Sequence, residues 1–363
     1  MTAPLLEVRD LQVRFPVPAV RGLGRQWVHA VEGVSFSLDR GQTLGLVGES
    51  GSGKSTIGNA LLRLVTPTAG QVLLDGQDVL TARGEQLRAM RRKAAMVFQD
   101  PLASLDPRQT VAESVREPLE IHRLHRGPAR QNRVAELMDL VGLPERFLDH
   151  YPHELSGGQR QRVCIARTLA GDPSLIVLDE ATASLDVSVQ AQIMNLLRDL
   201  QSELDLAYLF ISHDLAAVEH MSHRVQVMYL GRLMEQAGRE QIYSSPGHPY
   251  TQALMSAIPD DDPVAERQRR RILLQGDIPS PIDPPSGCVF RTRCPLAIDE
   301  CARHVPTVEL RRIIPRDLPP GLGISDGSGF WECQRWHFCR AIPSRFSANL
   351  RTIQFALGFA PLV

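Results

Sequence analysis

The chain has 363 residues, of which 43% are hydrophobic and 22% are charged, and its formal net charge is -1. This length allows one large domain and a smaller one, and the composition is ordinary for a globular protein. The small net charge argues against bulk attraction to nucleic acid or anionic lipid. No apolar run reaches the roughly 20 residues of a membrane-spanning helix, and residues 1–7 show no secretory signal. We therefore expect a cytoplasmic chain that acts at a membrane only through partners.

Short apolar runs alternate with helical patterns in the first half of the chain, which is typical of a buried, largely parallel sheet flanked by helices. Residues 44–47 predict a strand that leads into a glycine-rich loop. Residues 54–64 predict the next helix, which Pro67 cannot continue. Further strands are expected at residues 94–98, 175–178 and 207–211. Helical spacing predicts an inserted helical region at about residues 100–170, with helices at residues 110–122, 130–141 and 159–170.

The glycine-rich loop fits the phosphate-loop pattern, because residues 48–55 read Gly-Glu-Ser-Gly-Ser-Gly-Lys-Ser. Glycines allow consecutive backbone N–H groups to point at phosphates, and the helix that follows adds its positive N-terminal dipole. Lys54 can reach the β- and γ-phosphates, and the Ser55 hydroxyl can bind Mg²⁺. A glycine-rich turn with a surface lysine is the alternative, but the position between a strand and a helix argues against it. The predicted ATP-binding residues are Gly48, Ser50, Gly51, Gly53, Lys54, Ser55 and Thr56.

Two acids end the apolar run at residues 175–178. Asp179 has the position of the carboxylate that holds Mg²⁺ at the end of a neighbouring strand. Glu180 follows on another side of the strand, where it is free to polarise an attacking water as a general base. An acidic strand end is common, so this prediction depends on the phosphate loop upstream.

The string Leu-Ser-Gly-Gly-Gln at residues 155–159 opens the last of the three inserted helices. Ser156, Gly157, Gly158 and Gln159 therefore form a second N-terminal anion site, about a hundred residues after the first. One nucleotide does not fill two distant sites in one chain. We therefore predict that this second site closes over the γ-phosphate held by another protomer. An ordinary capped helix explains Ser156 but not the whole string.

In the order of these motifs the sequence resembles the nucleotide-binding subunits of ABC transporters, across residues 5 to about 240. The resemblance implies an α/β P-loop cassette with a mainly parallel sheet, antiparallel N-terminal strands and a helical subdomain. It also implies that Phe15 stacks on adenine, that Gln99 touches Mg²⁺ and water, and that His213 contacts the γ-phosphate. Residues 184–186 resemble the loop that acts across the dimer. Ala181 stands where many relatives have proline.

Proline becomes frequent after residue 244, and we place a domain boundary near residue 260. The expected units are a nucleotide-binding domain at residues 1–260, a small Cys-containing domain at 261–340 and a tail at 341–363. Residues 247–254, Gly-His-Pro-Tyr-Thr-Gln-Ala-Leu, resemble the segment after the cassette in the peptide/nickel branch of ABC importers. Pro-Pro-Ser-Gly-Cys at residues 284–288 and Arg-Cys-Pro at 293–295 extend that resemblance.

Five of the six cysteines lie in the last quarter of the chain, and Cys164 lies alone. In a reducing cytosol such a group favours a metal over disulfides. The resemblance implies a 4Fe-4S cluster at Cys288, Cys294, Cys301 and Cys333. Structural zinc and unligated thiols remain alternatives, and Cys339 could replace Cys333 as the fourth ligand.

The resemblance implies an ATPase that energises the import of dipeptides or oligopeptides from the cytoplasmic face of the inner membrane. Its expected partners are a second ABC ATPase subunit, identical or similar, two membrane permease subunits and, indirectly, an extracytoplasmic peptide-binding protein. No nucleic acid is expected. Import of nickel or a peptide-like compound, a non-transport ABC ATPase acting on ribosomes or DNA, and a redox sensor are the alternatives.

Overall fold

A computed structural model describes residues 3–18, 24–183, 185–259, 262, 267 and 271–304. All of these residues lie within the unit Met1–Arg311. No helix among them is long and apolar enough to cross a membrane.

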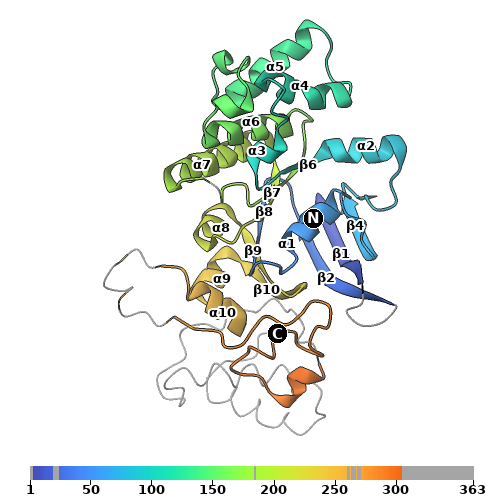
Figure 1. Cartoon of the computed structure of the whole chain (residues 1–363), viewed down its shortest axis with the longest axis vertical. Coiled ribbons are helices and arrows are strands. Elements are labelled where there is room, and N and C mark those ends of the chain that lie inside the picture. The colour runs from blue at the N-terminus through green and yellow to red at the C-terminus, as the bar shows by residue number, and fades with distance from the viewer. Residues whose placement is uncertain are drawn as a thin grey trace, which may run out of the picture. The chain divides into compact units, whose positions relative to one another are not determined.

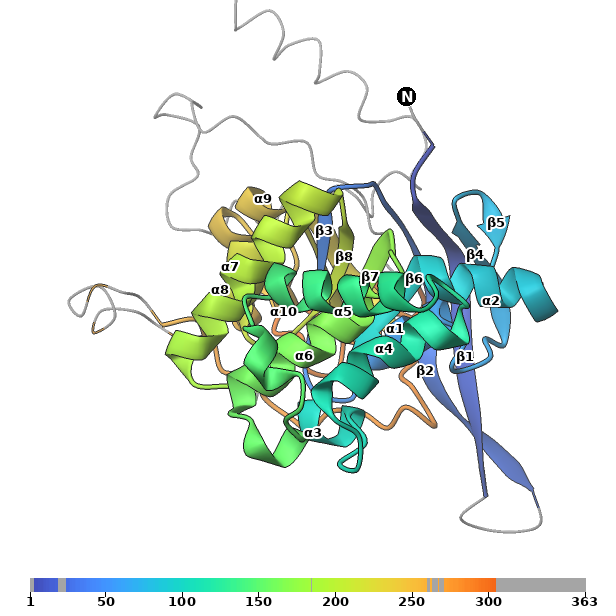
Figure 2. The same cartoon turned by 90° about the horizontal axis from the view of Figure 1, so that it is seen from above.

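The first sheet is antiparallel and has the strand order β2-β1-β4-β5. Its strands are β1 (Leu6–Pro18), β2 (Arg25–Leu38), β4 (Ala69–Leu74) and β5 (Gln77–Asp78). Buried Leu6 and Val8 alternate with less buried neighbours in β1, as expected for a sheet with one face on the core. β1 and β2 run on together as a two-stranded ribbon (Figure 2). This confirms the antiparallel N-terminal strands implied by the resemblance.

The second sheet has six strands in the order β10-β9-β3-β8-β7-β6, parallel except for the edge strand β10. The strands are β3 (Thr43–Val47), β6 (Ala94–Val97), β7 (Leu175–Asp179), β8 (Ala207–Ile211), β9 (Arg224–Tyr229) and β10 (Arg232–Gly238). Every residue of β3, β7 and β8 is buried, because a central parallel strand is covered on both faces. The parallel order brings the carboxyl ends of these three strands to one edge of the sheet, as predicted.

Helices near the sheets alternate with the strands along the chain. They are α1 (Lys54–Leu61), α2 (Gly84–Lys93), α7 (Val187–Leu204), α8 (Leu215–Met221), α9 (Arg239–Ser244) and α10 (Pro249–Met255). Helix α1 ends three residues before the predicted limit, with Leu62 as its C-cap. α7 begins at Asp186, whose carboxylate accepts a hydrogen bond from the Val189 N–H.

A group of helices between β6 and β7 forms a separate helical subdomain above the sheets (Figure 1). Its elements are α3 (Pro101–Ser104), α4 (Val111–Ile121), α5 (Pro128–Leu140), η1 (Glu145–Phe147), η2 (Pro152–Glu154) and α6 (Gly157–Leu169). Helix α4 starts at Thr110, whose hydroxyl accepts a hydrogen bond from the Glu113 N–H while the Glu113 carboxylate accepts one from the Thr110 N–H. The predicted helical insertion is therefore present in the fold.

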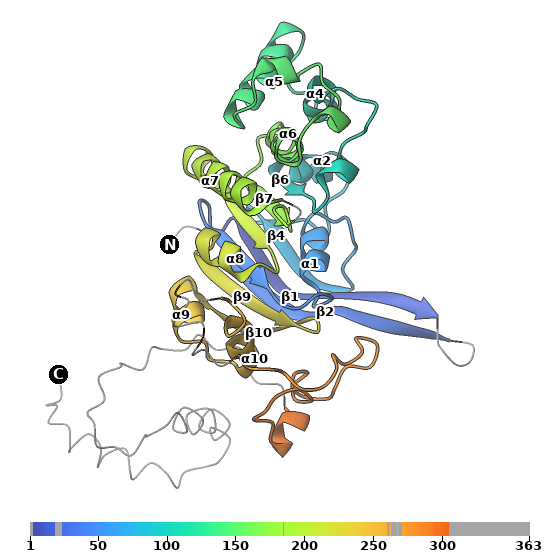
Figure 3. The same cartoon turned by 60° about the vertical axis from the view of Figure 1, so that its left-hand side comes forward.

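The segment at residues 271–304 has only one short helix, η3 (Asp299–Ala302), and lies beside α10 and β10 (Figures 1 and 3). It shares the cassette's core, because Phe290 is fully buried against Tyr229 and Tyr250. The His29 N–H of β2 donates a hydrogen bond to the Pro281 carbonyl oxygen at 2.9 Å. The domain boundary near residue 260 stays a prediction.

Candidate active site

The phosphate loop joins β3 to α1 and is shaped by glycines in the left-handed region of backbone space. Gly48 has φ 151°, Gly51 has φ 77° and Gly53 has φ 102°. A Cβ at Gly48 would overlap the carbonyl oxygen of Met228, and one at Gly53 would overlap that of Ala30. A Cβ at Gly51 would meet nothing within 4 Å. The loop is therefore seated against β9 and β2 at its two ends and open in its middle.

Lys54 lies inside this loop, with only 6% of the residue exposed. Its ammonium donates hydrogen bonds to the carbonyl oxygens of Gly48 at 2.8 Å and Glu49 at 2.9 Å. Burial lowers the pKa of Lys54, although the charges of Glu180, Asp179 and Glu49 oppose that change. The loop thus fixes a buried cation next to a helix N-terminus, which is the electrostatic arrangement that binds phosphate groups.

The Ser55 hydroxyl donates a hydrogen bond to the Asp179 carboxylate at 2.9 Å, which joins the start of α1 to the end of β7. Asp179 is 8% exposed, and burial raises its pKa while the hydrogen bond from Ser55 opposes the rise. A hydroxyl and a carboxylate are oxygen ligands of the kind that Mg²⁺ prefers. The predicted Mg²⁺-binding pair is therefore brought together.

Glu180 sits at the turn after β7 with φ 48°, an unusual conformation for a side-chain-bearing residue. Its N–H donates to the Ile211 carbonyl oxygen of β8 at 2.9 Å. The carboxylate accepts a hydrogen bond from Gln99 Nε2 at 2.7 Å and lies 3.1 Å from His213 Nδ1. Three residues predicted to act in catalysis therefore meet, each from the end of a different parallel strand.

Two family models match this chain. A model described as "ABC transporter" matches residues 31–183, and one described as "Oligopeptide/dipeptide transporter, C-terminal region" matches residues 234–301. The oligopeptide transport ATP-binding protein AppF of Bacillus subtilis is 50% identical over 306 residues, which is 83% of this chain and 92% of AppF.

Two solved cassettes have the same fold. The dimeric bacterial ABC transporter cassette MJ0796 is 29% identical with a TM-score of 0.56, over 64% of this chain and 98% of MJ0796. The cassette cbiO1 of Clostridium perfringens, part of the cbiONQ ABC transporter complex, is 28% identical with a TM-score of 0.57, over 67% of this chain and 92% of cbiO1. The chain belongs to the ABC transporter family. The matched cassette is followed by a region that matches the C-terminal region of oligopeptide and dipeptide transporters.

The residues of the predicted second anion site are at the N-terminus of α6. The Ser156 hydroxyl accepts from the Gln159 N–H at 3.3 Å, and the Gln159 side chain accepts from the Ser156 N–H at 2.8 Å. Gly158 packs against Val189 of α7, where a Cβ would come within 2.5 Å of the valine side chain. Ser156 and Gly157 are exposed. Helix α6 lies in the helical subdomain, apart from α1 and the phosphate loop (Figures 1 and 3).

Other predicted residues of the ABC cassette have less defined surroundings. Phe15 lies in β1, is 36% exposed and pairs with Val28 of β2. Ser50 is exposed and Thr56 is half-buried. The stacking role of Phe15 stays a prediction, and Ser184 lies outside the described residues.

Three residues at the phosphate loop were not predicted from the sequence. The Glu49 N–H donates a hydrogen bond to the Tyr250 hydroxyl at 3.0 Å, and Glu49 Oε2 accepts one from Arg293 Nη1 at 2.8 Å. Tyr250 and Arg293 belong to the two segments that resemble the peptide/nickel branch. That resemblance was the available signal, but nothing in it pointed to the phosphate loop.

The cysteines do not support the predicted 4Fe-4S cluster. The Cys288 N–H donates to the Cys301 carbonyl oxygen at 2.8 Å, and burial raises the pKa of Cys294 to about 11. Among the described residues, no three His, Cys, Asp or Glu side chains form a group that could hold a metal ion. Cys333 and Cys339 lie outside the described residues. Cys164 is buried in α6, where burial raises its pKa to about 12.

Proposed function

We propose that this chain is the ATP-hydrolysing subunit of an ABC importer of dipeptides or oligopeptides. The observation that carries the proposal is the meeting of Gln99, Glu180 and His213 beside the pair of Ser55 and Asp179. The peptide substrate is supported by the name of AppF and by the matched C-terminal region. Nickel or a peptide-like compound is the alternative cargo.

The site residues have separate roles in the transfer of the γ-phosphoryl group to water. Lys54 and the loop N–H groups bind the phosphates of ATP. Ser55, Asp179 and Gln99 would hold Mg²⁺, which supplies positive charge at the phosphates when bound. Glu180 accepts a proton from the attacking water, and His213 contacts the γ-phosphate.

A second cassette completes the site. The capping arrangement at Ser156 leaves the Gly157 and Gly158 N–H groups at an exposed helix N-terminus. These groups and the Ser156 hydroxyl would contact the γ-phosphate held by a partner cassette, which is a copy of this chain or a similar one. The dimeric state of MJ0796 supports this arrangement.

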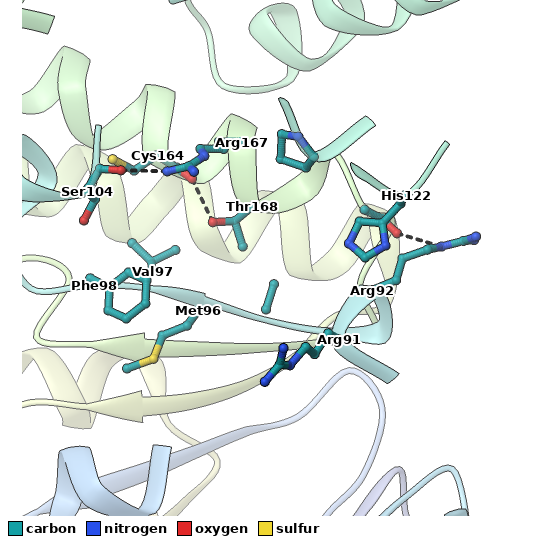
Figure 4. Close-up of a pocket in the computed structure, with 13 residues that line it drawn as sticks. Arg91, Arg92, Met96, Val97, Phe98, Ser104, His122, Cys164, Arg167 and Thr168 are labelled. Carbon is teal, nitrogen blue, oxygen red and sulfur yellow. Dashed lines mark hydrogen bonds between the residues drawn. The ribbon is translucent and has the colours of Figure 1, made fainter. Parts of the chain in front are cut away.

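A groove that reaches Phe98, the residue before Gln99, is the proposed contact with the membrane permease (Figure 4). Its walls come from α2, β6, α3, α4 and α6, and the lining residue Phe98 is 46% exposed. The other labelled lining residues are Arg91, Arg92, Met96, Val97, Ser104, His122, Cys164, Arg167 and Thr168. Because Phe98 precedes Gln99, whose side chain donates a hydrogen bond to Glu180, a permease segment in this groove would sense the state of the ATP site.

The substitution Glu180→Gln tests the assignment of the general base. It keeps the size of the side chain but removes the proton acceptor, so ATP still binds while hydrolysis falls by about 100-fold or more. Steady-state phosphate release and ATP binding by the chain assembled with its permease measure the two effects. The control Glu203→Gln changes an exposed acid of α7 and should leave both unchanged. Undiminished phosphate release from Glu180→Gln would contradict the assignment.

The importer function has its own test. A transporter reconstituted with its extracytoplasmic binding protein, and with this chain facing the vesicle lumen, should take up a labelled dipeptide only when ATP is enclosed in the lumen. Recovery of the chain with ribosomes or DNA, without a permease and without ATP-dependent peptide uptake, would favour the non-transport alternative.

A further inference from the structure

Glu49, the second residue of the phosphate loop, is fixed through three different groups. Its N–H donates to the Tyr250 hydroxyl at 3.0 Å, and its carbonyl oxygen accepts from the Lys54 ammonium at 2.9 Å. Its carboxylate forms an ion pair with Arg293 at 2.8 Å. Two of the three partners come from beyond residue 240, so the chain's C-terminal region contacts the loop directly.

The ion pair is shielded from water on the arginine side. The Arg293 side chain is 10% exposed and that of Glu49 is 26% exposed. The guanidinium lies 5.8 Å from the centre of the Tyr229 ring, and its Nε is buried without a hydrogen-bond partner among the described residues. Glu49 is therefore the acidic partner that balances this largely buried cation.

An aromatic cluster holds the arginine in place. Tyr229, Tyr250 and Phe290 are all fully buried, with ring centres 4.9 to 5.3 Å apart. The Arg293 N–H donates to the Phe290 carbonyl oxygen at 3.0 Å, so a tight turn connects the cluster to the arginine. Packing of this kind restricts the motion of a long side chain and of whatever it binds.

The charge of Glu49 is the reason that the loop needs this partner. A carboxylate in a loop that binds a polyanion repels the phosphates, and the repulsion is strong where water is excluded. Arg293 neutralises the carboxylate from the side of the C-terminal region. Glu49 lies within the matched ABC transporter region and Arg293 within the matched C-terminal region, so the pair joins the two parts.

We propose that Arg293 is a positioning residue of the ATP site. It neutralises Glu49 and, together with Tyr250, holds the phosphate loop ready for nucleotide, so the C-terminal region sets the affinity of this cassette for ATP. The inference rests on the proposed function, since it assumes that this loop binds ATP.

The test is a set of affinities of the full-length chain for the Mg²⁺ complex of AMP-PNP, a non-hydrolysed ATP analogue, measured by titration calorimetry. Arg293→Met should raise the Kd about tenfold, because it leaves the Glu49 charge unpaired. The double variant Glu49→Gln with Arg293→Met should return the Kd to within about threefold of the wild type, because no charge is left unpaired. Arg293→Lys, which keeps the charge, should bind more tightly than Arg293→Met.

The matched control is Arg291→Met. Arg291 is in the same turn but donates a hydrogen bond to the Ser286 carbonyl oxygen, and its loss should leave the Kd unchanged.

A wild-type Kd for Arg293→Met would overturn the inference. A double variant as weak as Arg293→Met would overturn the charge role, as packing alone would then explain the loss. A wild-type chain that does not bind AMP-PNP would instead overturn the proposed function. If Arg293→Met does not fold, as checked by its thermal unfolding midpoint, the same comparison is made with Arg293→Gln and its double variant with Glu49→Gln. Equal affinity of those two variants would overturn the inference.

Discussion

At the scale of single residues, the three glycines of the phosphate loop have different tasks. Gly48 and Gly53 have positive φ and touch the backbones of β9 and β2, whereas Gly51 has positive φ in open space. The sequence predicted their role in exposing N–H groups. The contacts with Met228 and Ala30 could not be predicted, because those residues are far away in the chain and belong to strands with no motif.

This difference predicts unequal effects of alanine at two of the glycines. Gly51→Ala should lower the free energy of unfolding by about 1 kcal/mol, because only the strain of a positive φ is added. Gly53→Ala also makes a Cβ overlap the Ala30 carbonyl oxygen, so it should lower the free energy of unfolding by about 3 kcal/mol. Thermal unfolding of the full chain without nucleotide measures both. Equal losses at the two positions would show that the contact with β2 is unimportant.

The site residues that lie in local sequence motifs could be predicted, whereas the one that comes from a distant segment could not. Lys54, Asp179 and Glu180 lie in short local motifs at strand ends, so their meeting follows from parallel strand order. Arg293 is 244 residues from Glu49 in the chain, in a proline-rich segment without periodicity. No sequence pattern predicts an ion pair between two residues so far apart in the chain.

At the scale of elements, the four helices predicted from the sequence, α1, α4, α5 and α6, begin within two residues of the predicted starts, whereas the other helices of the described residues were not predicted. The capping residues Thr110, Ser156 and Asp186 each begin a helix. Neighbour relations in the sheet were harder to predict. β3 lies between β8 and β9, and β9 and β10 carry no motif that would mark them as the far edge.

The start of α4 gives a test of helix capping in the helical subdomain. Thr110→Ala removes the hydroxyl that accepts from the Glu113 N–H and should destabilise the chain by about 1 kcal/mol. Thr110→Ser keeps a hydroxyl and should lose much less. Denaturant unfolding monitored by circular dichroism compares the two. A loss as large for serine as for alanine would exclude the cap as the cause.

At the scale of the whole molecule, the two halves of the proposed ATP site lie in different parts of this chain. The phosphate loop, Asp179, Glu180 and His213 form one half, and the N-terminus of α6 in the helical subdomain forms the other (Figure 1). The C-terminal region adds a contact to the first half through Arg293. The central claim about how the chain works is therefore that two cassettes pair to complete each ATP site.

The most direct test of that claim is the substitution Ser156→Arg, with ATP hydrolysis and AMP-PNP affinity measured on the same preparation. Because Ser156 completes a partner's site and not its own, the affinity should stay within about threefold of the wild type. Hydrolysis should fall about 100-fold or more, as it does when a group that stabilises the transition state is lost. Ser156→Thr, which keeps the hydroxyl cap, should retain both. Hydrolysis at the wild-type rate by Ser156→Arg would contradict a site shared between two cassettes.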